Sequence, residues 1–242
     1  MRRVAVFVEG QTELVFVREL LIKWFEYDSK KIGFSCYNLL SNELCDTSYQ
    51  YGDEQSEHYY LIVNVGNDSS VFGKIRARLP FLVKGNYDLI IGLRDMYSTQ
   101  YIKDAQGREI NAEVTQMHID AVKEQIDALE NGEMIHFHFA IMEVEAWLLG
   151  MCQYLVSIDE RLTTNFIEEK TGLNLEQDPE TTIFHPAAEL EKIYELVGKK
   201  YGKHDSDIST IMSILSSEDF MNLALSGKCQ SFHVFLNSLV DP

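Results

Sequence analysis

The stretch that decides the predicted fold is Val4-Ala5-Val6-Phe7-Val8-Glu9-Gly10-Gln11-Thr12-Glu13. Its first five residues are β-branched, aromatic or small, which predicts a strand buried on both faces. Gly10 allows a sharp turn after this strand, and Thr12 is the expected N-cap of a following helix. The stretch therefore predicts a strand that passes directly into a helix, with Glu9 at the carboxyl end of the strand.

The same alternation continues through the first two thirds of the chain. A helix is expected to follow residue 13 and to reach about residue 26, because apolar residues recur there at helical spacing. Residues 41–57 are polar and irregular, which predicts a surface loop. A turn at residues 66–70 should start a helix that stops or kinks at Pro80. Later helices are marked by apolar stripes in residues 119–129 and 144–155, and the further strands are expected at residues 34–40, 59–65, 87–93 and 136–142. Strands that alternate with helices predict an α/β fold with a mostly parallel sheet.

From about residue 157 the strand signals give way to helical ones. Helices are expected at residues 160–170, 186–199, 206–216 and 229–239, and Pro186 fits an early helical position. No Gly/Ser/Pro-rich linker separates this part from the rest. We therefore predict an α/β core over residues 1–156 and a helical cap, packed on that core, over residues 157–242.

Composition limits the classes of protein that the chain can belong to. The 242 residues carry a formal net charge of −17, which disfavours nucleic-acid binding unless positive charge gathers locally or a divalent cation bridges to phosphate. No apolar run approaches the ~20 residues that cross a bilayer, and the four cysteines have no zinc-ligand spacing. The chain is expected to be cytoplasmic, with free thiols and no membrane association.

Acidic residues stand where three of the predicted strands end. They are Glu9, Asp95 and the pair Glu143 and Glu145. Because the carboxyl ends of parallel strands meet at one edge of a sheet, these side chains should converge there. Clustered carboxylates need a divalent cation such as Mg²⁺ or Mn²⁺, and such cations favour phosphate substrates.

Other interpretations of these acids stay open. Glu13 lies in the first turn of a helix, where an acid complements the macrodipole without any further role. The whole set could also be a solvated sheet edge in a domain of unrelated function. Nucleotide-binding loops of the GxxxxGK[ST] and GxGxxG types and the GxSxG elbow of serine hydrolases do not occur in the sequence.

Three segments together resemble a known family. VFVEGQTE at residues 6–13, DLIIGLRDMYS at 88–98 and FAIMEVEAWLL at 139–149 are similar to the Toprim fold. The closer resemblance is to Toprim-like bacterial proteins often encoded beside ATPases and related to the OLD-family nucleases. It extends to short landmarks in the helical part, at residues 179–180, 185–186, 201–203 and 229–232.

The resemblance implies metal-dependent phosphodiester chemistry. It assigns Glu9 as a metal ligand or general acid/base and Asp95 as a metal ligand. Glu13, together with Glu143 or Glu145, matches acidic positions that could serve a second metal. Lys203 matches a basic position that could contact a phosphate. A nucleic-acid substrate, an ATPase partner and a role in phage defence are expectations from the family.

One position departs from the family pattern. The second aspartate of the Toprim pair is Tyr97 here, and a phenol stays protonated at neutral pH. Either Glu143 or Glu145 supplies the missing oxygen, or metal binding is weakened, or catalysis is lost and a binding role remains. The sequence therefore supports a metal-dependent nuclease and, as the alternative, a non-catalytic regulatory or partner subunit.

Overall fold

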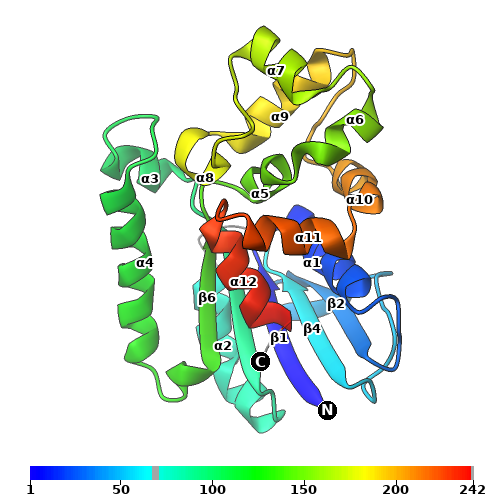
Figure 1. Cartoon of the computed structure of the whole chain (residues 1–242). Helices are drawn as coiled ribbons and strands as arrows, with labels where there is room; N and C mark the ends of the chain where they lie inside the picture. Colours follow the sequence, from blue (N-terminus) through cyan, green and yellow to red (C-terminus); the bar gives the residue numbers. More distant parts are fainter. Residues whose placement is uncertain (67–70, 241–242) are drawn as a thin grey trace. The chain divides into compact units, whose positions relative to one another are not determined.

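The computed structural model describes residues 1–66 and 71–240, which form an α/β fold around one six-stranded sheet (Figure 1). The strands lie in the order β3-β2-β4-β1-β5-β6, and the pairings of β1 with β4 and β5, and of β2 with β4, are parallel. This confirms the predicted α/β class with a mostly parallel sheet. The strands are β1 (Arg2–Val8), β2 (Ile32–Leu40), β3 (Glu43–Asp46), β4 (His58–Asn64), β5 (Leu89–Asp95) and β6 (Ile135–Ala140).

The central strand β1 is buried on both faces, as its sequence predicts. Val4 to Val8 have no exposed surface, and the strand pairs along its length with β4 on one side and β5 on the other. Ala5 and Phe7 point to one face of the sheet and belong to a core cluster with Val71, Ile75 and other residues of the helix α2 (Val71–Lys84). Alternate residues of β1 therefore fill two different apolar layers.

The two crossover helices of the sheet lie on opposite faces (Figure 1). The helix α1 (Gln11–Trp24) packs on β4, β1 and β2, whereas α2 packs on β1. The connections β1-α1-β2 and β4-α2-β5 run across the sheet in opposite directions, so right-handed crossovers must place their helices on opposite faces.

Two details of these helices differ from the sequence prediction. The N-cap of α1 is Gly10, and Thr12 lies inside the first turn, so the predicted cap was two residues late. Pro80 does not end α2, because the helix continues to Lys84. A proline inside a helix removes one backbone hydrogen bond, and burial of Leu79 and Leu82 on either side of Pro80 stabilises the continued helix. The turn predicted at residues 66–70 lies almost wholly outside the described residues.

The predicted loop at residues 41–57 contains a strand. Strand β3 pairs antiparallel with β2 at the edge of the sheet, and Leu40 lies opposite Glu43. The two residues between them, Ser41 and Asn42, have φ angles of 49° and 70°, as in a type I′ hairpin turn. The prediction missed this hairpin because Ser-Asn is a weaker turn signal than Asn-Gly.

The C-terminal part is helical, as predicted, but its helices are shorter and more numerous than the predicted ones. The helix predicted over residues 144–155 breaks at Met151 into α5 (Val144–Gly150), a 3-10 turn (Cys152–Tyr154) and α6 (Leu155–Ile158). Three helices were not predicted: α3 (Thr99–Asp104), α8 (Pro179–Thr182) and α11 (Ser217–Leu225). The others are α4 (Ala112–Asp127), α7 (Thr164–Thr171), α9 (Pro186–Glu195), α10 (Asp205–Ile214) and α12 (Gln230–Val240).

The chain forms two compact units that are interleaved in the sequence. Unit 1 holds residues 1–94, 117–138 and 238–242, and unit 2 holds residues 95–116 and 139–237. The sheet with α1 and α2 belongs to unit 1 except for the last residues of β5 and β6. The predicted division at residue 156 stays a prediction, and each unit is described by itself below. Within the described part of the chain, no helix combines the length and the apolar character that a membrane span requires.

Candidate metal centre

Three buried carboxylates meet in unit 2. Asp95 is the last residue of β5, and Glu143 and Glu145 lie at the start of α5, just after β6. The backbone beyond the two strands holds these segments together, because Met96 N–H donates to the Ala140 carbonyl (2.9 Å) and Tyr97 N–H donates to the Met142 carbonyl (2.7 Å). One carboxylate oxygen of each acid lies within 4.8 Å of the other two. The predicted convergence of Asp95, Glu143 and Glu145 is therefore present.

Each carboxylate is held by a hydrogen bond to one of its two oxygens. Asp95 Oδ1 accepts from the backbone N–H of Val144 (3.1 Å), at the first residue of α5. Glu143 Oε2 accepts from the backbone N–H of Ala187 (2.9 Å), in the first turn of α9. Glu145 Oε1 accepts from the phenol of Tyr201 (2.7 Å). Two helix N-termini and a tyrosine thus fix the orientation of the three acids.

The second oxygen of each carboxylate faces the ammonium group of Lys203. The distances from Nζ are 3.2 Å to Asp95 Oδ2, 3.3 Å to Glu143 Oε1 and 3.2 Å to Glu145 Oε2. Among the described residues, Glu145 Oε2 finds no partner with hydrogen-bond geometry, although this residue is fully buried. Nζ therefore marks a point that three carboxylate oxygens surround, and one of these oxygens lacks a hydrogen bond.

The electrostatics of the cluster favour a further positive charge. Three carboxylates and one ammonium leave an excess of negative charge in a site where each acid is at most 5% exposed. Burial, reinforced by Glu145 and Glu143 and opposed by Lys203, raises the pKa of Asp95 to about 7. Burial, opposed by Lys203, also raises the pKa of Glu143. A divalent cation among these oxygens would relieve both effects.

The backbone is strained on two sides of the cluster. Met142, the residue before Glu143, has a φ angle of 63°, and Lys203 itself has a φ angle of 58°. For a residue with a β-carbon, this left-handed backbone conformation costs about 1–2 kcal/mol of free energy. Such strain persists only where the surrounding structure imposes it, and it is found most often at functional sites.

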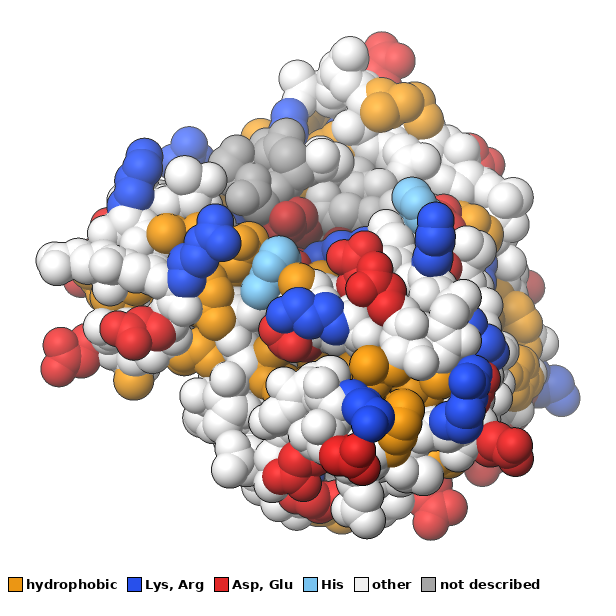
Figure 2. Space-filling view, turned by 90° about the horizontal axis from the view of Figure 1, so that it is seen from above, with side chains coloured by type: hydrophobic (Ala, Val, Ile, Leu, Met, Phe, Trp, Pro, Cys, Tyr) orange, Lys and Arg blue, Asp and Glu red, His pale blue; other side chains and the backbone are white. Residues whose placement is uncertain are grey.

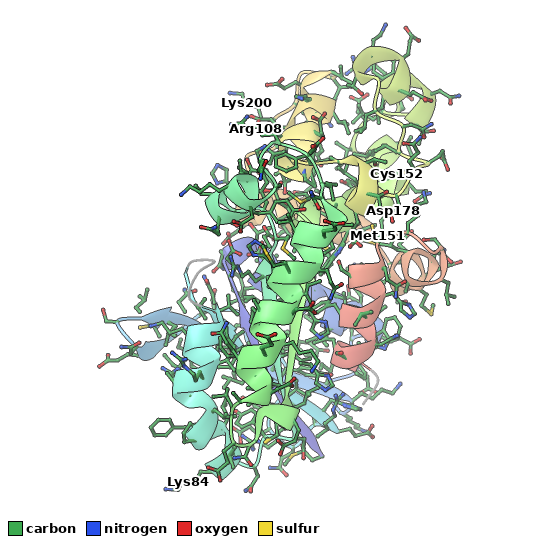
Figure 3. The ribbon with its side chains drawn as sticks, turned by 90° about the vertical axis from the view of Figure 1, so that its left-hand side faces the viewer. Lys84, Arg108, Met151, Cys152, Asp178 and Lys200 are labelled. Carbon is green, nitrogen blue, oxygen red and sulfur yellow. The ribbon has the colours of Figure 1, made fainter. Side chains whose placement is uncertain are left out.

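Tyr97 does not join the carboxylates in any contact that the structure defines. Its ring stacks on His185, with 4.4 Å between ring centroids and an interplanar angle of 5°, and it meets Phe184 edge to face. His185 Nε2 lies 3.7 Å from Glu143 Oε2. Burial, together with the charges of Lys203 and Arg108, lowers the pKa of His185 (Arg108 is labelled in Figure 3). Tyr97 thus belongs to an aromatic stack beside the cluster.

A further buried acid outside the cluster, Glu180, supports α5. Glu180 in α8 accepts hydrogen bonds from Trp147 Nε1 (2.9 Å) and from the backbone N–H (3.1 Å) and hydroxyl of Ser231 in α12. Asp178, the N-cap of α8 (Figure 3), accepts from the backbone N–H groups of Glu180 and Cys229 (3.0 Å each). Trp147 is fully buried, as its helical spacing predicts. These bonds fix the helix that carries Glu143 and Glu145.

Glu9 and Glu13 belong to unit 1, and the contacts described for the cluster do not include them. Glu9 follows β1 and is half-buried, whereas Glu13 lies in the first turn of α1 and is 3% exposed. Gly10 is close to Glu13, because a β-carbon at Gly10 would come within 3.0 Å of Glu13 Oε2. The assignment of these two acids as metal ligands stays a prediction.

Sequence reasoning did not identify two residues that shape the site. Tyr201 and His185 were recognised only as parts of short landmarks, and the structure shows that they contact Glu145 and Glu143. The only sequence feature that could have indicated Tyr201 is its position two residues before Lys203. On the face that Figure 2 shows, Lys and Arg side chains lie among acidic ones.

Comparison with protein-family models assigns the chain to a family. A family model described as "Domain of unknown function (DUF4276)" matches residues 8–240, which is nearly the whole chain. Comparisons with curated proteins and with solved structures found no match. The matched region includes every residue of the carboxylate cluster and covers most of each compact unit, and the chain therefore belongs to the DUF4276 family.

Proposed function

We propose that this protein is a divalent-metal-dependent, nuclease-like enzyme that processes phosphodiesters. The observation that supports the proposal is that one carboxylate oxygen from each of Asp95, Glu143 and Glu145 faces the same point. A donor set of carboxylate oxygens suits hard cations such as Mg²⁺ and Mn²⁺. The Glu145 oxygen without a hydrogen bond fits such an ion, because a buried polar atom of this kind is rarely left unused.

The residues around this point would have separate roles. Asp95, Glu143 and Glu145 would hold the cation, since their other oxygens are already fixed by the protein. When bound, the cation would polarise a phosphate and lower the pKa of a water. Lys203, whose side chain is 33% exposed, would move from the centre of the cluster and contact a phosphate oxygen.

The resemblance to Toprim-like proteins adds Glu9 and Glu13 to this proposal. Glu9 would act as a metal ligand or general acid/base, and Glu13 would serve a second cation. A nucleic-acid substrate, a role in phage defence and an ATPase partner also belong to the proposal through this resemblance alone. Glu13 has a competing explanation, because an acid in the first turn of α1 stabilises that helix by itself.

A specific observation favours the second candidate function. Tyr97 stacks on His185 where the Toprim pattern has a metal-binding aspartate, and Lys203 already supplies a cation to the three acids. A cluster neutralised by lysine could be a structural ion network in a non-catalytic regulatory or partner subunit. The two functions differ in whether Mg²⁺ or Mn²⁺ displaces Lys203.

Calorimetry of Mg²⁺ and Mn²⁺ binding tests the proposal directly. The wild type should bind in the micromolar to millimolar range, and Asp95→Asn and Glu145→Gln should each abolish binding. Asp127→Asn, which removes an exposed carboxylate from α4, is the matched control. Cleavage of plasmid DNA, single-stranded DNA and RNA is then assayed with the same proteins. Equal metal binding in wild type and Asp95→Asn would contradict the site, and absence of metal binding in the wild type would favour the regulatory subunit.

A further inference from the structure

A basic groove lies in unit 1, between α2 and the β2-β3 hairpin. Lys74, Ala77, Arg78 and Phe81 are spaced i, i+3, i+4 and i+7 on α2, so they form one stripe along the helix. Together with Asn42 of the hairpin turn they line a cavity of about 330 Å³. This volume lies at the lower end of the range of small-ligand pockets, about 300–1,000 Å³.

The hairpin turn fixes the two cations of this groove. Lys74 Nζ donates to the side-chain oxygen of Asn42 (2.6 Å), and Arg78 Nη2 donates to the backbone carbonyl of Asn42 (2.7 Å). A lysine has three N–H donors and an arginine has five, so each side chain retains donors for a ligand. The two cations are therefore positioned in advance, and binding loses less side-chain entropy than it would with two free chains.

The groove also presents an exposed aromatic ring. Phe81, in the last turn of α2, is 74% exposed, which is unusual for a phenylalanine. Lys84, three residues later on the same helix, points away from the end of α2 in Figure 3. A flat apolar face beside cations is the combination that binds single-stranded nucleic acids, because bases stack on rings and phosphates contact Lys and Arg.

The charge of the groove contrasts with that of the chain. The formal net charge is −17, yet none of the described residues that line the cavity is acidic. We propose that this groove binds a segment of single-stranded nucleic acid, with a base on Phe81 and phosphates on Lys74 and Arg78. An acidic protein segment would use the two cations equally well but would gain little from the exposed ring, so the ring favours nucleic acid. This inference goes beyond the metal centre and does not require it.

Fluorescence anisotropy with a labelled oligothymidylate tests the groove. The titration is done in EDTA, so that a metal at the carboxylate cluster contributes nothing and failure of the groove is distinguishable from failure of the metal centre. Phe81→Ala should weaken binding roughly 5- to 100-fold, as loss of one base-aromatic stack does. Lys74→Gln/Arg78→Gln should reduce the slope of log K against log salt concentration by about 1.4, the value for two phosphate contacts with a single strand.

Matched controls separate the groove from general charge and surface effects. Lys31→Gln/Lys123→Gln removes two exposed cations elsewhere, and Leu225→Ala removes another exposed apolar side chain, 82% exposed. Both controls should bind as the wild type does. The proposal is overturned if the wild type does not bind at low salt, or if the groove variants and the controls bind alike. Displacement of the oligonucleotide by polyglutamate at equal charge would also overturn it, since an acidic protein segment would then be the occupant.

Discussion

Nζ of Lys203 and Oε2 of Glu145 lie 3.2 Å apart, and Nζ lies at the same distance from Asp95 Oδ2 and at 3.3 Å from Glu143 Oε1. Protein-bound Mg²⁺ and Ca²⁺ bind oxygen at about 2.0–2.6 Å, so a cation at this point would draw the three carboxylates inward by about 1 Å. The lysine therefore acts as a cation that balances the acids in the absence of metal. A metal ion and Lys203 must compete for the same three oxygens.

This competition predicts the behaviour of Lys203→Met. Without metal, the variant leaves three buried carboxylates unbalanced, and we expect the free energy of unfolding to fall by about 3–5 kcal/mol. Loss of the competing charge should strengthen Mn²⁺ binding roughly tenfold or more. Urea unfolding in EDTA and calorimetry with Mn²⁺ measure the two effects, and Lys200→Met in the same loop is the control. Unchanged stability together with weaker Mn²⁺ binding would mean that Lys203 does not balance the cluster.

Asp95→Asn should stabilise the metal-free protein in alkaline solution. The pKa of Asp95 is raised from 3.8 to about 7, so the folded state binds this proton more tightly than the unfolded state. Its contribution to stability is full below pH 3.8 and is lost as pH rises through 7. An asparagine avoids that loss, and we expect a gain of about 1–3 kcal/mol near pH 8. Urea unfolding in EDTA at pH values on both sides of 7 checks this, and a variant less stable than wild type near pH 8 would contradict it.

The sequence predicted the elements that carry the site better than it predicted the site's contacts. Val4 to Val8 predicted a central strand because a strand covered on both faces must be apolar along its whole length. Asp95 and Glu143 were expected together because parallel strands end at one edge. The partners Tyr201 and Ala187 come from segments more than forty residues away, and no local pattern encodes such a contact. Pro80 failed as a helix stop because tertiary burial outweighed the loss of one hydrogen bond.

The type I′ geometry of the turn between β2 and β3 can be tested by substitution of Ser41. Ser41 has a φ angle of 49°, where a serine is strained and an asparagine is tolerated. Ser41→Asn should therefore raise the free energy of unfolding by about 0.5–1 kcal/mol. Chemical denaturation measures the gain, and Ser41→Val, which disfavours positive φ, should lower stability instead. If both variants lose stability equally, the turn is not of type I′.

Glu180 should be one of the most sensitive positions in unit 2. Glu180→Ala removes the acceptor of the Ser231 backbone N–H and one of the two acceptors of Trp147 Nε1, the other being Ser231 Oγ, in a buried site. We expect a loss of about 2–4 kcal/mol in the free energy of unfolding, because buried donors without acceptors keep their desolvation cost. Tryptophan fluorescence during urea unfolding measures the change in the free energy of unfolding. Glu176→Ala, which truncates an exposed glutamate in the same region, should leave stability within about 0.5 kcal/mol of wild type.

His138 should set part of the acid sensitivity of the fold. Burial, with a smaller contribution from His136, lowers the pKa of His138 from 6.5 to about 4, so the folded state keeps this imidazole neutral. Stability from this residue is full above pH 6.5 and is lost as pH falls toward 4, up to about 3 kcal/mol in total. His138→Gln should flatten the dependence of the free energy of unfolding on pH over this range. Parallel pH profiles for wild type and His138→Gln would show that the imidazole becomes protonated equally in the folded and unfolded states.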